Sequence, residues 1–196
     1  TMIVLVDERG QDVDGQELVG EGELMVLAET VTPQTINFMS RHAGGPLNVT
    51  AIAERLEALG LRLATDGHGP RGASVMVSVN ARGVNGTGVS AHDRATTIRK
   101  LADPDSSIRD FVQPGHITPL RAQIGGVLRR AGHTEASVDL AVLAGCQPVA
   151  LISAILDDDG EVASTPYLLE FARRHELQIT SIKDLIAYRR RTEKLI

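Results

Sequence analysis

The feature that most constrains the fold is PVALISAIL at residues 148–156, the most apolar run of the chain. An apolar run of this length without alternation is typical of a strand buried on both faces, so we predict the central strand of a sheet here. Further strands are predicted at residues 2–6, 24–29, 74–80 and 177–180. Helical patterns lie between them, without an internal repeat or a linker. The sequence therefore predicts one compact α/β (or α+β) domain over residues 1–196.

Composition narrows the class of protein. A chain of 196 residues with 42% apolar and 3% aromatic residues fits one domain whose core is aliphatic. The net charge of −5 argues against a general nucleic-acid binder. One cysteine, Cys146, excludes an internal disulfide framework and fits a reducing compartment. No apolar run approaches the roughly 20 residues that span a bilayer, and no signal peptide is visible. We expect a soluble, cytoplasmic protein that does not bind membranes.

Capping residues predict where helices begin. Thr32 with Pro33 after it starts one helix, and Ser90 is expected to cap a helix at residues 91–102. Thr50 is expected to cap a helix at residues 51–59, and Thr134 to cap a helix that ends at Gly145. Between these helices we predict a polar loop at residues 7–23 and extended segments at residues 117–122 and 126–128.

The sequence RAGHTE at residues 130–135 is the first candidate site. His133 is predicted to lie at the N-terminus of a helix, beside free backbone N–H groups and the positive end of the helix dipole. Arg130 adds a fixed positive charge and Thr134 a hydroxyl. This combination suits an anion, most simply a phosphate monoester. The alternative is a surface turn whose histidine contacts only solvent.

Seven motifs, taken together, resemble one known family. They are AETVTP at 28–33, VSVNAR at 77–82, TGVSA at 87–91, DRATTIR at 93–99, PGH at 114–116, RAGHTE at 130–135 and DLIAYRRR at 184–191. In this order and spacing they are similar to 3,4-dihydroxy-2-butanone-4-phosphate synthase, a lyase of riboflavin biosynthesis that consumes ribulose 5-phosphate. The resemblance covers nearly the whole chain. It implies a single synthase-like domain, and the cyclohydrolase domain that follows in many relatives is not expected within these residues.

The resemblance also implies a chemistry and a set of site residues. The family removes a proton from the third carbon of the sugar phosphate, and after dehydration and rearrangement it releases the fourth carbon as formate. It uses Mg²⁺ or Mn²⁺ and works as a homodimer with active sites at the subunit interface. By resemblance His133 is the metal-binding histidine, and Arg130, Gly132 and Thr134 form the phosphate-holding loop. His116 corresponds to a histidine that matters for catalysis; the alternative is a buried structural histidine.

The acidic residues depart from the family pattern. The family's Arg-Glu-Asn-Glu-Gly-Asp-Leu aligns with residues 18–24, so its arginine is Leu18 and its metal-binding glutamate is Val19. Glu21 aligns with the second glutamate of the family pattern and is a candidate catalytic residue. Glu23 aligns with the aspartate that contacts the substrate in the family. A valine cannot ligate a hard cation. On the predicted central strand the family's catalytic glutamate aligns with Ala154.

Two further departures from the family pattern are Asn80, where the family has aspartate, and Asn48, where it often has cysteine.

These changes in the site residues leave three hypotheses about function. The one we place first is a divergent enzyme acting on ribulose 5-phosphate or a related phosphorylated hydroxy-ketone, in a specialised pathway and able to work without a metal. The second is an authentic synthase whose metal site is rebuilt by acids of the loop at residues 7–23. The third is a non-catalytic protein that binds a sugar phosphate or pairs with an active relative.

Overall fold

The computed structural model describes residues 1–7, 20–64, 74–84 and 86–193. The strands are β1 Met2–Asp7, β2 Glu21–Leu27, β3 Asn48–Ala51, β4 Ser74–Val75, β5 Val79–Ala81, β6 Phe111–Arg121, β7 Val149–Ala154 and β8 Gln178–Ser181. The helices are α1 Pro33–His42, α2 Ala53–Ala58, α3 Ala91–Ala102, α4 His133–Leu143, α5 Thr165–Arg174 and α6 Ile182–Thr192, with short 3-10 turns η1 Ala28–Thr30, η3 Ile108–Asp110 and η4 Gly126–Leu128.

One mixed sheet runs through the molecule. Its strand order is β4-β6-β3-β7-β2-β1-β8, and β5 pairs with β6 beside this path. β7 lies between β3 and β2 and is antiparallel to both, so the prediction of a central strand from residues 148–156 is confirmed. Because strands and helices alternate in one layered unit, the prediction of an α/β (α+β) domain is confirmed as well.

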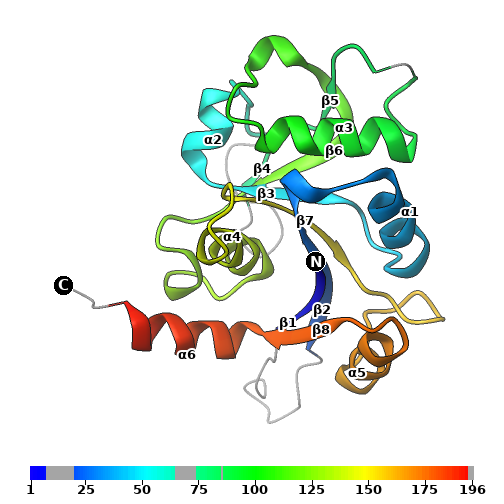
Figure 1. Ribbon diagram of the computed structural model, residues 1–196, viewed down its shortest axis with the longest axis vertical. Helices are drawn as coiled ribbons and strands as arrows, with labels where there is room; N and C mark the ends of the chain where they lie inside the picture. The colour runs from blue at the N-terminus through cyan, green and yellow to red at the C-terminus, as the bar shows by residue number, and fades with distance from the viewer. Residues whose placement is uncertain (8–19, 65–73, 85, 194–196) are drawn as a thin grey trace.

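Helices cover both faces of the sheet. Figure 1 shows α4 and α6 on one side of the strands and α1 and α5 on the other. On the first face Leu5, Met25 and Ile152 pack against Ala136 of α4 and Leu185 of α6. On the other face, intervening strand residues pack against helical side chains that include those of Ile36, Met39, Ile98 and Leu168. Alternate residues of β1, β2 and β7 therefore belong to different cores, and we call the first side the α4 face.

Capping predictions succeed where the interaction is local. Thr32 accepts a hydrogen bond from the backbone N–H of Thr35 and Pro33 is the first residue of α1, as predicted. Ser90 accepts from the N–H of Asp93 at the start of α3, also as predicted. Both bonds form within four consecutive residues, so the sequence alone contains the whole motif.

The prediction that Thr50 caps a helix is wrong. Thr50 lies within β3, and α2 begins only at Ala53 after the N-cap Ile52. The Thr50 hydroxyl lies 2.8 Å from the Ser137 hydroxyl of α4 and also donates to the carbonyl of Ala150. Its backbone belongs to the sheet because β6 and β7 flank β3, a tertiary constraint that capping rules do not include.

Two expected irregular segments also differ. Residues 126–128 form η4 instead of an extended segment, because Gly125 and Gly126 have φ of 94° and 60° and the backbone N–H of Val127 donates to Asp139. Glu21 and Glu23 are not in a loop but in β2, where antiparallel pairing with β1 extends the strand. Residues 8–19 of the predicted loop, including Leu18 and Val19, lie outside the described residues.

Candidate functional site

Glu23 stands in a row that crosses three strands. It is paired with Leu5 of β1 on one side and with Ala154 of β7 on the other. Residues paired across a ladder point to the same face, as do residues two apart on a strand. Since Leu5, Met25 and Ile152 belong to the core on the α4 face, the Glu23 side chain also points to that face. The sheet therefore aims this carboxyl at the helix above it.

His133 meets Glu23 from that helix. It is the first residue of α4, its side chain is 8% exposed, and its Nδ1 lies 4.0 Å from Glu23 Oε1. Thr134 is therefore not the N-cap: Gly132 holds that position, without a side-chain cap, and Thr134 is a buried residue of the first turn. The helix starts earlier than predicted because Gly132 already has extended φ and ψ and its carbonyl accepts from Ala136 N–H.

Burial controls the ionisation of this pair. It raises the pKa of Glu23 from 4.5 to about 8, and the charge of Glu21 adds to the rise. Burial also lowers the pKa of His133, against the opposing charges of Asp7 and Glu21. Both groups are consequently neutral at pH 7 in the protein without a ligand, so the 4.0 Å approach is not an ion pair under those conditions.

Two atoms of the pair are left for a ligand. Among the described residues, Glu23 Oε2 and His133 Nε2 are both buried and have no hydrogen-bond partner. Leaving such atoms unpaired costs about 1–3 kcal/mol each, so their presence on two side chains that approach each other points to a group that binds there. A carboxylate oxygen and a neutral imidazole nitrogen are suitable donors for a divalent cation, and Mg²⁺ commonly takes one or two carboxylates and keeps several waters. The donor set fits Mg²⁺ or Mn²⁺.

Arg130 and Gly132 lie beside the start of α4. Arg130 Nη1 is 2.6 Å from Oε2 of Glu135, a carboxylate that is 1% exposed and that also accepts from the backbone N–H of Gln123. A Cβ at Gly132 would lie 2.9 Å from Arg130 Nη1, so glycine allows the guanidinium to approach the helix end. Sequence reasoning missed Glu135 as the residue that positions Arg130; its place in the first turn of a predicted helix was the available signal.

His116 lies at the same end of the sheet but apart from the pair. Thr118 of β6 and Met25 of β2 belong to one row of paired residues that crosses β3 and β7. His116 lies two residues before Thr118, and Glu23 lies two residues before Met25. Three interstrand spacings correspond to about 14 Å. The ring is exposed, and its Nδ1 lies 3.1 Å from Nδ2 and 3.3 Å from Oδ1 of Asn80. The alternative of a buried structural histidine is therefore wrong.

The family model described as 3,4-dihydroxy-2-butanone 4-phosphate synthase matches residues 1–188. The chain belongs to this family. The resemblance drawn from the seven motifs is thereby confirmed.

Curated relatives from this synthase family have the same residue as this chain at nearly half of the aligned positions. The chain is 48% identical to the 3,4-dihydroxy-2-butanone 4-phosphate synthase of Neisseria meningitidis serogroup A, over 93% of this chain and 51% of the relative. It is 46% identical to the riboflavin biosynthesis protein RibBA of Aquifex aeolicus, over 100% of this chain and 47% of the relative. The chain thus spans about half the length of the curated relatives it matches.

Solved synthases share the fold. The structure of the Candida albicans enzyme matches with a TM-score of 0.86 at 34% identity, covering 95% of this chain and 90% of that one. A synthase solved in complex with two magnesium ions matches with a TM-score of 0.85 at 39% identity, covering 97% and 91% of the two chains. The single-domain fold predicted from the resemblance agrees with these structures.

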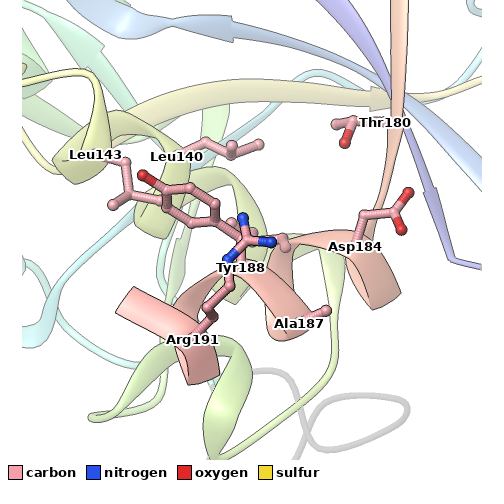
Figure 2. A pocket seen from close by; sticks show the side chains of 8 residues that line it. Leu140, Leu143, Thr180, Asp184, Ala187, Tyr188 and Arg191 are labelled. Carbon is pink, nitrogen blue, oxygen red and sulfur yellow. The ribbon is translucent and has the colours of Figure 1, made fainter. Parts of the chain in front are cut away.

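A groove of about 560 Å³ opens between α4 and α6, away from the synthase-like site. Figure 2 shows Leu140 and Leu143 of α4 facing Tyr188 and Arg191 of α6 across it. These leucines belong to the C-terminal half of α4, whereas His133 is its first residue. The groove is therefore separate from the Glu23–His133 pair.

Among the helices that the structure describes, none is long and apolar enough to cross a bilayer.

Proposed function

We propose that this chain is a working 3,4-dihydroxy-2-butanone 4-phosphate synthase, a lyase that converts ribulose 5-phosphate into 3,4-dihydroxy-2-butanone 4-phosphate and formate. The observation that carries the proposal is the buried pair of Glu23 Oε2 and His133 Nε2, both without a hydrogen-bond partner among the described residues. The identity of nearly half the residues to proteins named as synthases supports it.

Glu23 and His133 are the residues that would hold Mg²⁺ or Mn²⁺. When bound, the cation neutralises negative charge that develops on the keto and hydroxyl oxygens of the substrate during enolisation. In its absence, burial keeps the Glu23 carboxyl protonated at pH 7. A nearby dication favours the ionised form, so cation binding and loss of the Glu23 proton are coupled.

The start of α4 would hold the phosphate. Arg130 has a 27% exposed side chain, and its ion pair with Glu135 holds the guanidinium at the start of the helix. Gly132 is the N-cap of α4 and Thr134 belongs to its first turn, whose backbone N–H groups lie at the same end of the helix. Free N–H groups, the helix dipole and a bidentate donor together favour a phosphate monoester.

His116 and Glu21 are the proposed proton-transfer groups. Glu21 lies two residues before Glu23 on β2, so its side chain is on the same face of the sheet. Its charge raises the pKa of both Glu23 and His133. The exposed His116 is about three strands away from Glu23 within one chain. We therefore propose a cytoplasmic homodimer in which His116 of one copy reaches the site of the other. Imidazole suits proton transfer near neutral pH.

A second candidate function rests on Ala154. Because Ala154 is paired directly with Glu23, this row of the sheet carries one carboxyl where the family resemblance leads us to expect two. A divergent lyase on a related phosphorylated hydroxy-ketone would fit that difference. The phosphate-binding elements are the same in both proposals.

Product analysis separates the two proposals. Purified protein is incubated with ¹³C-labelled ribulose 5-phosphate, with Mg²⁺ or with EDTA, and formate is followed by carbon NMR. The synthase proposal predicts formate with Mg²⁺ and none with EDTA, and a loss of formate in Glu23→Gln. Absence of formate in every condition, with ribulose 5-phosphate still raising the melting temperature, would favour the divergent enzyme. Glu57→Gln, which changes an exposed glutamate of α2, is the matched control.

A further inference from the structure

β6 bulges at the point where it carries His116. Two adjacent residue pairs of its ladder with β5 enclose residues 113–116, which are left without partners in that ladder. Side chains from the neighbouring segment hold the bulge through its backbone instead. The N–H of Gly115 donates to Ser78 Oγ at 3.1 Å, and the N–H of His116 donates to Asn80 Oδ1 at 2.9 Å. The place of His116 is therefore set by hydrogen bonds to side chains.

Two backbone groups fix the orientation of the Asn80 amide. Its Oδ1 accepts from the N–H of His116, and its Nδ2 donates to the carbonyl of Thr87 at 3.2 Å. A backbone N–H can only donate and a carbonyl can only accept, so the amide oxygen and nitrogen cannot be exchanged. Asn80 is 8% exposed, and a Cβ at Gly88 would lie 2.0 Å from its Nδ2. The chain thus closes tightly over one orientation of this amide.

The second amide hydrogen of Asn80 meets the His116 ring. The ring Nδ1 lies 3.1 Å from Asn80 Nδ2 and 3.3 Å from Oδ1. Nδ2 has one hydrogen beyond the one it donates to Thr87, whereas Oδ1 already accepts from the backbone. If Nδ1 carried a proton, two N–H groups would face each other across the shorter distance. Nδ1 is therefore the acceptor, which leaves the proton of the neutral ring on Nε2.

We propose that Asn80 is a positioning residue that holds His116 in the Nε2–H tautomer. The neutral ring of this exposed residue then presents a hydrogen-bond donor to a ligand, instead of a base. In the proposed lyase, on which this step rests, His116 donates to a substrate oxygen that gains negative charge during enolisation. Removal of the proton from carbon then falls to another group, for which Glu21 is the candidate.

Ring ¹⁵N spectra test the tautomer directly. Long-range ¹H–¹⁵N correlations of the full chain with labelled histidine, at about pH 9 where imidazole is neutral, show which nitrogen carries the proton. Wild type should have a bare Nδ1 and a protonated Nε2 at His116, and His116→Gln identifies the signals by their absence. Asn80→Asp should reverse the two, because a carboxylate only accepts and so draws the proton to Nδ1. Asn37→Asp, at an exposed position of α1, is the matched control and should keep the wild-type pattern.

A second variant removes the amide without adding a charge. Asn80→Ala should give averaged ring nitrogen shifts at His116, since neither tautomer is then held. A protonated Nδ1 in wild type would overturn the proposal. A tautomer that stays the same in both Asn80 variants would overturn it as well.

Formate release separates a donor from a base at position 116. Glutamine can place an amide N–H where the imidazole has its Nε2–H, but it cannot take up a proton. With Mg²⁺ and ribulose 5-phosphate, His116→Gln should therefore be about tenfold more active than His116→Leu, the value of one hydrogen bond to a developing charge. Equal loss in the two variants would refute the donor role. If wild type releases no formate, the proposed lyase function fails, while the ring spectra still decide the tautomer.

Discussion

The substitution Glu23→Gln should change how stability depends on pH. In the folded protein without metal, burial and next the charge of Glu21 raise the pKa of this carboxyl from 4.5 to about 8. Between these values the folded state keeps a proton that the unfolded chain has released. The free energy of unfolding therefore falls as pH rises through this window and levels off above about pH 8.

The size of this effect follows from the same shift. The span from 4.5 to about 8, at about 1.4 kcal/mol per pH unit, gives an upper limit of about 5 kcal/mol. It is an upper limit because water entry and relaxation reduce the cost of a buried charge. Glutamine has nearly the same shape and stays neutral. Glu23→Gln should thus match wild type near pH 4.5 and exceed it by several kcal/mol at pH 9.

Urea unfolding in EDTA at pH 5, 6, 7, 8 and 9 measures this difference. The two curves should diverge as pH rises, while Glu57→Gln, at an exposed position of α2, should follow wild type throughout. With Mg²⁺ at pH 8 the wild type should regain stability and Glu23→Gln should not. A stability difference between Glu23→Gln and wild type that is constant from pH 5 to pH 9 would refute the assignment of a buried, protonated carboxyl.

Three further predictions concern contacts around the site. Arg130→Met should destabilise by about 3–5 kcal/mol in urea unfolding, because it leaves the 1% exposed carboxylate of Glu135 without its ion pair; an unchanged midpoint would contradict this. Gly115→Ala should yield little folded protein by circular dichroism, because the new Cβ would lie 2.0 Å from the carbonyl carbon of Val79. A native spectrum with an unshifted melting temperature would contradict this close contact. Thr50→Val should cost about 0.5–1.5 kcal/mol by removing the hydrogen bond to Ser137, whose hydroxyl keeps its bond to the Thr134 carbonyl. Additivity with Ser137→Ala in a double-mutant cycle would argue against the bond between the two hydroxyls.

Sequence patterns predicted the parts of the fold that depend on neighbouring residues. The apolar run at residues 148–156 could only be satisfied by burial on both sides, and β7 lies in the middle of the sheet. Thr32 and Ser90 cap helices through bonds that span three residues. Thr50 failed because its environment is set by β6, β7 and Ser137, which are far away in sequence.

The sequence suggested residues for the candidate site but not their geometry. Resemblance to the family pointed to His133, Glu23 and Arg130, and the structure brings the first two within 4.0 Å. The raised pKa of Glu23 depends on its pairing with Ala154 and on the position of α4 over β2. Strand register and helix placement arise from tertiary packing, so no local pattern encodes them.

Crystals grown with Mn²⁺ and ribulose 5-phosphate would test most directly whether Glu23 and His133 form one cation site. The anomalous signal of Mn²⁺ locates the ion independently of any assumption about its ligands. We expect a peak within about 2.0–2.4 Å of both Glu23 Oε2 and His133 Nε2, with the substrate phosphate at the start of α4. A peak elsewhere, or substrate bound with no ion between these two atoms, would contradict it.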